Sequence, residues 1–304
     1  MVYIVMIVVV FFMFWMVYGL ILLLLVAFLV LLERKVLGMV QIRKGPNVVG
    51  VFGLVQTVMD GVKLLIKKFF MKEKNGFFLL VPVLALVLSF FHWMVVPFPF
   101  GFWCSEYSVL FTFVLMGFMV FVVLWVGWGS ESSYSFIGSV RGVAQMISYE
   151  VVFMFYLCCF LLVVCSFDWS DFLSKNNSLH SGVKGFMLVV WLVLILSELN
   201  RTPFDLVEGE SELVSGFNVE YSGYGFTLLF LSEYMNIWFM SFLSGIVFYG
   251  INGFLWFGML LVLLFVLWIR SVLPRFKFTQ LIFLMWGVYL PLVFLYLLVS
   301  LLVF

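Results

Sequence analysis

The sequence predicts an all-α integral membrane protein with eight transmembrane helices and an additional interfacial amphipathic helix. The 304-residue chain is 66% hydrophobic and only 10% charged, with a mean hydropathy of +1.26. Soluble globular domains are about 45–50% apolar and about 25% charged. Apolar runs of about 20 residues, long enough to cross a bilayer, recur from end to end. The net charge of +1 argues against a nucleic-acid partner.

Each expected span follows from one apolar run of a single membrane domain, 1–304. The first run is longer than a perpendicular crossing requires, which favours a tilted helix, and its length and lack of a basic start predict a retained helix rather than a signal peptide. The fifth run is the shortest, and a short segment is tolerated when it is buried in a bundle. The charge-poor run 226–269 would be about 66 Å long as one helix, so a break is predicted at YGING, 249–253. The spans are expected near 3–32, 76–98, 108–128, 143–166, 184–199, 221–248, 251–270 and 281–303.

Basic residues gather on one predicted side of the membrane. With eight spans, the loops of that side and their helix ends carry 14 of the 16 Lys and Arg residues, and only Lys175 and Lys184 fall on the other side. By the positive-inside rule, the basic side is the cytoplasm or, in mitochondria, the matrix. Most acidic residues lie there too, which favours a docking face for a large partner over merely solvated loop ends. The loops of this side are 33–75, 129–142, 200–220 and 271–280.

The first of these loops contains a predicted amphipathic helix, 51–70. Its polar residues Gln56, Asp60, Lys63 and Lys67 recur at spacings of 4, 3 and 4, which places them on one helical face. Such a segment lies in the membrane interface or between the bundle and a partner. It is interpreted either as an ordinary interfacial helix or as the wall of a site for an amphipathic ligand.

The most acidic stretch is SELNRTPFDLVEGESELVSGF, 197–217, which includes most of the predicted acidic loop 200–220. Thr202 and Pro203 are expected to open a helix there, with Asp205 in a capping position. A helix cap is therefore one interpretation of Asp205. Glu208 and Glu212 lie four residues apart, where like charges on a helix repel, although a solvated surface helix tolerates such a pair.

Three glutamates lie within or at the end of apolar spans. Glu150 is about two turns into the fourth span, Glu198 ends the fifth, and Glu233 is about 12 residues into the sixth. A glutamate at such depth costs roughly 2–3 kcal/mol or more unless it is paired, hydrated or protonated. Together with the acidic loop, these residues suggest a chain of carboxyl groups that passes protons. A paired structural glutamate is the alternative at each position.

Neither a metal site nor a nucleotide-binding motif is expected. The four cysteines form no CxxC pair and are interpreted as packing residues, and His92 and His180 have no ligand spacing. These physical arguments leave three classes open: a proton-linked transporter or channel, a subunit of a membrane redox machine, and a membrane anchor. If the chain belongs to a redox machine, the redox centres lie in other subunits.

Five motifs closely resemble the subunit 1 family of NADH:ubiquinone oxidoreductase, respiratory complex I. Their order, their spacing and the eight spans fit that family over nearly the whole chain. The motifs are ERKVLGMVQIRKGPNVVG (33–50), GWGSESSYSFIGSVRGVAQMISYE (127–150), ELNRTPFDLVEGESELVSGFNVEY (198–221), EYMN (233–236) and LWIRSVLPRF (267–276).

The resemblance implies a core membrane-arm subunit of the mitochondrial inner membrane, with both termini on the intermembrane-space side. Its expected partners are hydrophilic quinone-module subunits on the matrix side, neighbouring membrane-arm subunits and lipids. The chain itself is expected to bind no cofactor and to have no independent activity. Ubiquinone would be a substrate, and FMN and the iron–sulfur clusters would lie in partner subunits. A related quinone-linked or hydrogenase-linked membrane subunit remains an alternative.

The resemblance also implies two sets of site residues. One set surrounds the passage of ubiquinone, and the other forms a carboxylate-lined proton path that leads away from it. The quinone set comprises Glu33, Arg34, Asp60, Arg201, Phe230 and Arg270. The proton-path set comprises Glu150, Glu198, Asp205, Glu208, Glu212 and Glu233.

Overall fold

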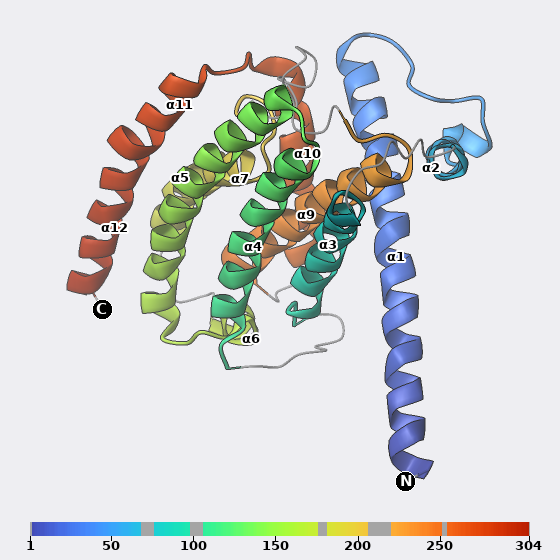
Figure 1. The fold of residues 1–304 in the computed structure, drawn as a ribbon. Helices are drawn as coiled ribbons and strands as arrows, with labels where there is room; N and C mark the ends of the chain where they lie inside the picture. Colours follow the sequence, from blue (N-terminus) through green and yellow to red (C-terminus); the bar gives the residue numbers. More distant parts are fainter. Residues whose placement is uncertain are drawn as a thin grey trace.

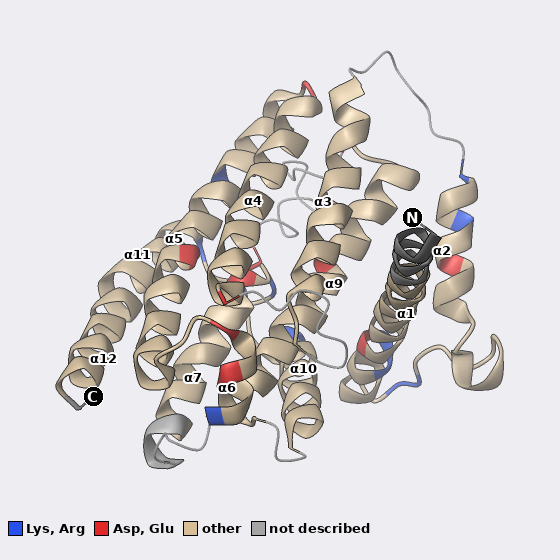
Figure 2. Ribbon diagram, turned by 90° about the horizontal axis from the view of Figure 1, so that it is seen from below, with Lys and Arg blue, Asp and Glu red and all other residues tan. Residues whose placement is uncertain are grey.

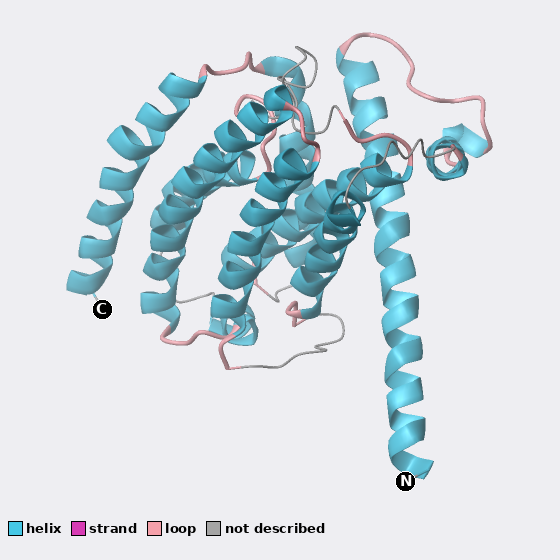
Figure 3. Cartoon of the chain, viewed as in Figure 1, coloured by secondary structure: helices cyan, strands magenta, loops and turns pink. Residues whose placement is uncertain are grey.

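The computed structural model describes residues 2–67, 76–97, 106–175, 181–205, 220–250 and 254–303. In this part of the chain every regular element is a helix, and none is a strand (Figure 3). Seven helices are long and apolar enough to cross a membrane, and Gly185–Glu198 is a shorter apolar helix. The predicted all-helical membrane class is therefore confirmed. The eighth crossing and the side on which the termini lie stay predictions.

The first helix, α1 (Val2–Val40), continues eight residues past the predicted span 3–32. Its last turns contain Leu, Glu, Arg, Lys and Met, which are good helix formers, so the helix extends beyond the apolar run. It ends in a turn at 41–43, where the Arg43 N–H donates to the Gly38 carbonyl at 2.8 Å. The N-terminal end of α1 projects beyond the bundle (Figure 1).

The amphipathic helix, α2 (Gln56–Ile66), begins later than the predicted residue 51. A short 3₁₀ turn, η1 (Val51–Gly53), precedes it. Gly50 and Gly53 have φ of 72° and 78°, a left-handed conformation that interrupts an α-helix and that glycine adopts readily. The predicted end, 68–70, lies outside the described residues. In Figures 1 and 2, α2 lies beside α1 and outside the rest of the bundle.

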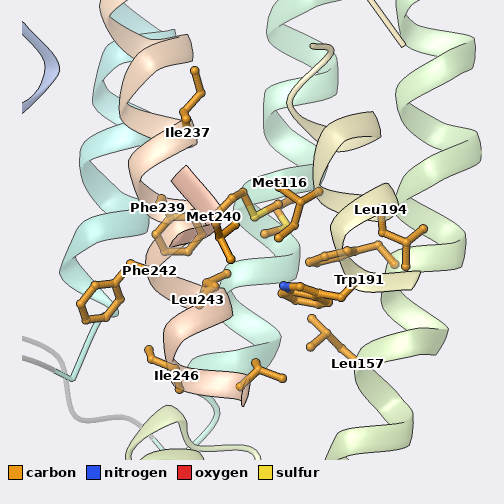
Figure 4. Close-up of a cluster of buried hydrophobic side chains, with 14 of the residues drawn as sticks. Met116, Leu157, Trp191, Leu194, Ile237, Phe239, Met240, Phe242, Leu243 and Ile246 are labelled. Atoms are coloured by element: carbon orange, nitrogen blue, oxygen red, sulfur yellow. The ribbon is translucent and has the colours of Figure 1, made fainter. Parts of the chain in front are cut away.

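The centre of the bundle is α9 (Tyr224–Phe248), whose side chains contact several surrounding helices. Figure 4 shows Leu243 and Met240 of α9 facing Met116 and Trp191. The Trp191 ring lies 5.0 Å from the Phe153 ring, between centroids. In a membrane such packing stabilises the bundle through van der Waals contact rather than through removal from water. The helices around α9 include α3 (Gly76–Met94), α4 (Ser108–Gly129), α5 (Ser133–Val164), α7 (Ser181–Glu198) and α10 (Leu255–Val272).

Helix α5 begins ten residues before the predicted span 143–166, so the predicted loop 129–142 is mostly helical. The sequence suggests a loop because this stretch is polar. Its small residues, however, are buried where α5 approaches α4, and Ser139 lies close to Gly127. Small side chains allow helices to pack closely in a membrane, which explains how polar residues continue the helix. A further short helix, α6 (Trp169–Lys175), was not predicted.

The C-terminal half follows the predicted break at 249–253. Helix α9 ends at Phe248, Gly250 has φ of 64°, and α10 begins at Leu255. The last span begins earlier than the predicted residue 281, and a π-turn divides it just before Pro291. Proline has no backbone N–H to donate, and its ring clashes with the carbonyl one turn earlier, so the regular helical hydrogen bond is lost there. Both chain ends lie on the lower side of Figure 1. This span comprises α11 (Phe278–Leu284), the π-turn η3 (Met285–Tyr289) and α12 (Leu290–Val303).

Candidate functional site

Glu33, in the last two turns of α1, is the centre of a buried ionic cluster. The residue is only 3% exposed. Its Oε1 accepts hydrogen bonds from the guanidinium groups of Arg201, at 3.2 Å, and Arg270. Its Oε2 accepts one from the Tyr234 hydroxyl at 2.6 Å, and the Arg201 guanidinium lies 4.7 Å from the centroid of the Tyr234 ring. A buried carboxylate requires such partners, and we refer to Glu33, Arg201, Tyr234 and Arg270 as the Glu33 cluster.

A cavity of about 600 Å³ lies beside this cluster, between α1, α2 and α9. Its walls are mainly aliphatic and aromatic and include Phe230, whose ring lies 4.3 Å from the Tyr234 ring between centroids. Arg34 and Asp60 add polar groups to the wall and form an ion pair at 2.7 Å, and Gln56 donates to Asp60 at 3.1 Å. A mostly apolar cavity with a few placed polar groups suits an amphipathic small molecule. We refer to it as the entry cavity.

The loop after α7 is held in place by a buried side chain of α5. The amide nitrogen of Gln145, which is fully buried, donates to the Asn200 side chain at 3.1 Å and to the Phe204 carbonyl at 2.6 Å. These bonds fix the backbone that carries Arg201 into the Glu33 cluster.

A turn, not a helix, follows Arg201. The Phe204 N–H donates to the Arg201 carbonyl at 2.8 Å, and residues 202–205 are not helical. The predicted helix start at Pro203 is therefore wrong, and the residues that follow Asp205, where it could cap a helix, lie outside the described residues. Asp205 is 1% exposed and lies 3.4 Å from the Arg275 guanidinium. Contacts with α5 and with the segment after α10 override the local helix signal here.

Glu198 and Glu233 line a second, smaller cavity of about 80 Å³ inside the bundle. One carboxyl oxygen of Glu198 is buried and has no hydrogen-bond partner within the described part of the chain. Glu150, on α5, is close enough to Glu198 to interact with it electrostatically. The lining is mostly apolar but includes polar side chains such as Glu198, Glu233 and Asn236. A cavity of this size has room for a few water molecules, so carboxyl groups that line it can exchange protons through water. We refer to it as the acid cavity.

The Glu33 cluster and the acid cavity are both built from α9 and from the end of α7 with the loop that follows it. Tyr234 of the cluster follows directly after Glu233 of the cavity on α9. Arg201 of the cluster follows Glu198 of the cavity by three residues. A displacement of α9 or of the loop after α7 therefore changes both places at once.

The described residues include ten of the twelve predicted site residues, whereas Glu208 and Glu212 lie outside them. Figure 2 shows the charged residues as isolated bands on helices that are otherwise uncharged. All six residues of the quinone set belong to the Glu33 cluster or to the entry cavity. In the proton-path set, Glu198 and Glu233 line the acid cavity, Glu150 lies close enough to Glu198 to interact with it, and Asp205 pairs with Arg275 instead.

Sequence reasoning missed Tyr234, Arg275 and Gln145. One signal was available for Tyr234, because it lies four residues after Phe230 and therefore on the same helical face. The other two residues act across long sequence separations, such as the 59 residues between Gln145 and Phe204, and no local pattern marks them.

Apolar helices that surround a buried ionic cluster, with the entry cavity beside it and the acid cavity inside the bundle, define a multi-pass membrane protein with a charged internal site. Within the described residues, no group of three or more His, Cys, Asp or Glu side chains could hold a metal ion. The family model for NADH dehydrogenase matches residues 3–301. The chain therefore belongs to the subunit 1 family of NADH:ubiquinone oxidoreductase, as its motifs predict.

Relatives from distant organisms are similar over nearly the whole chain. The NADH-ubiquinone oxidoreductase chain 1 of Apis mellifera ligustica is 43% identical over 281 residues, which are 90% of this chain and 92% of the relative. The protein of the same name from Aedes aegypti is 42% identical over 272 residues, or 88% and 87% of the two chains. That from Arabidopsis thaliana is 42% identical over 291 residues, or 89% and 90%.

Proposed function

We propose that this chain forms the ubiquinone access chamber of a proton-pumping NADH:ubiquinone oxidoreductase in the mitochondrial inner membrane, and that it links quinone reduction to proton translocation. The observation that carries the proposal is the position of the Glu33 cluster. It adjoins the entry cavity through Phe230 and Tyr234, and it shares α9 with the acid cavity. The names of the relatives supply the substrates, NADH and ubiquinone.

The entry cavity matches the chemistry of ubiquinone, which has a polar ring and a long apolar tail. Leu, Val and Phe side chains of α1, α2 and α9 line most of the cavity and can contact the tail. The Arg34–Asp60 ion pair offers hydrogen-bonding groups for the ring as it passes. The Glu33 cluster lies beside the cavity, next to Phe230, and the positive charges of its Arg201 and Arg270 favour a ring that gains electrons there.

Coupling in this proposal is electrostatic. Negative charge that develops on the quinone competes with Glu33 for the two guanidinium groups, because both attract the same cations. A change in the Glu33–Tyr234 bond shifts α9, and with it the neighbouring Glu233 in the acid cavity. The carboxyl groups around that cavity then exchange protons through water.

The proposed docking face for the hydrophilic arm lies at the end of α1 and in the loop that follows it. Ile42 and Val48 are 96% and 94% exposed there, beside the basic residues Arg43 and Lys44. Exposed apolar residues next to charges are typical of surfaces that a partner covers. FMN and the iron–sulfur clusters belong to that partner in this proposal, and the chain contributes the chamber.

The test compares Phe230→Ala with Phe283→Ala in the intact complex. Phe230 lines the entry cavity, whereas Phe283 is 73% exposed on α11 and serves as the control. Loss of the ring of Phe230 should raise the KM for a short-chain ubiquinone roughly three- to tenfold, since an aromatic contact contributes roughly 0.5–1.5 kcal/mol. NADH oxidation by a hydrophilic acceptor reports assembly. An unchanged quinone KM in Phe230→Ala would count against the chamber.

A further inference from the structure

His92, on α3, is a buried titratable side chain that the proposed proton path does not include. It is 2% exposed, and its ring stacks on the ring of Phe239 of α9 with centroids 4.9 Å apart. Neither ring nitrogen makes a well-directed hydrogen bond to another described residue. Buried polar atoms of this kind are costly unless a partner or water satisfies them. An aliphatic side chain would fill the same space between two apolar helices without this cost.

Asn236 connects His92 to the acid cavity. It lies on α9, one turn before Phe239, and its side-chain amide is close enough to the imidazole to interact with it. Its Oδ1 is also buried without a well-directed partner in the described chain. The same residue lines the acid cavity together with Glu198 and Glu233. Water in that cavity can therefore bridge the carboxyl groups to Asn236, and Asn236 reaches the imidazole.

We propose that His92 is an additional proton-exchanging group of this protein, joined to the acid cavity through Asn236. This inference rests on the proposed function, because it adds a group to the proposed proton path. A neutral imidazole carries a proton on one nitrogen and accepts one on the other. A proton released by Glu198 or Glu233 passes through water to a ring nitrogen and returns by the same route, so only N–H and O–H bonds change. Among the described residues, the titratable groups at the acid cavity are these two carboxyl groups, and Glu150 interacts with Glu198.

The test uses His92→Gln and His92→Leu in the intact complex. Gln keeps hydrogen-bonding groups but cannot titrate, and Leu keeps apolar packing. If His92 exchanges protons, both variants should lower quinone-coupled proton pumping about threefold or more. Both should also change the pH profile of quinone-coupled turnover, because each removes the ionisable imidazole. A purely structural histidine would leave this pH profile unchanged in His92→Gln.

Ser89→Ala is the matched control, because Ser89 is also buried on α3 and its hydroxyl contacts Met235 of α9 at 3.6 Å. It should keep the wild-type pH profile. Asn236→Leu should reproduce the loss seen in His92→Gln, and the double variant should be no worse than either single variant, because both break one route.

Two outcomes separate this inference from the proposed function. Wild-type pumping and pH profile in His92→Gln, in a complex where Glu198→Gln abolishes pumping, would overturn the role of His92 alone. Wild-type pumping in Glu198→Gln would overturn the proposed proton path and the role of His92 with it.

Discussion

Replacing Tyr234 by Phe removes one hydroxyl group and leaves the rest of the Glu33 cluster in place. The ring still contacts the Arg201 guanidinium and the Phe230 ring, at 4.7 Å and 4.3 Å from its centroid. The hydroxyl donates a 2.6 Å hydrogen bond to Glu33 Oε2, and Glu33 is too buried for water to replace that donor freely. Because a hydrogen bond to a charged group contributes about 1.5–3 kcal/mol, we expect the free energy of unfolding to fall by about 2 kcal/mol.

The assay is the midpoint of thermal inactivation of quinone reduction in the purified complex. A loss of about 2 kcal/mol lowers the midpoint of a chain of this length by about 3 °C. Tyr221→Phe is the control. Tyr221 is also buried and stacks on Phe78 with centroids 4.0 Å apart, but its hydroxyl has no hydrogen-bond partner within the described residues. Its removal should leave the midpoint unchanged or raise it. Equal midpoints for the two variants would refute the stabilising role of the Tyr234–Glu33 bond.

Three further predictions follow from the proposed function. Glu150→Gln and Glu233→Gln should leave assembly and NADH oxidation by artificial acceptors nearly intact, whereas pumping and quinone-coupled turnover fall together; wild-type pumping stoichiometry in both would make these glutamates structural. Arg34→Ala and Asp60→Ala should impair quinone reduction more than NADH oxidation by a hydrophilic acceptor, and because the pair is 44% and 37% exposed, each should cost at most about 1 kcal/mol of stability. Equal loss of both activities would indicate failed assembly instead. The purified single chain should contain no flavin, haem or iron in stoichiometric amount, which absorption spectroscopy and metal analysis measure.

Composition and apolar runs predict much of the fold, because the bilayer imposes both a helical backbone and a minimum helix length. The break after Phe248 was also predictable from its glycines. The early start of α5 at Ser133 was not, since small polar residues signal a loop in water but a close helix contact in a membrane. The turn at 202–204 was missed because Gln145 and Arg275, remote in sequence, determine its shape.

The candidate site was predictable to the extent that charges are rare in this chain. Glu33, Arg201 and Arg270 stand out in apolar surroundings, and the structure brings these three residues together. Tyr234 did not stand out, because tyrosine occurs 12 times and its hydroxyl matters only when a carboxylate faces it. Glu233 and Tyr234 are consecutive residues but face different sites. The site that each one faces depends on the rotation of α9 about its axis, and packing across the whole bundle sets that rotation.

The Glu33 cluster joins parts of the chain that are synthesised at very different times. Because translation starts at the N-terminus, Glu33 is made 168 residues before Arg201, 201 before Tyr234 and 237 before Arg270. Until these partners arrive, the carboxylate is more stable in water at the membrane edge than inside the bundle. The Glu33 cluster is therefore complete only after α10, which carries Arg270, has been synthesised. A chain that ends before α10 therefore leaves Glu33 without its Arg270 partner.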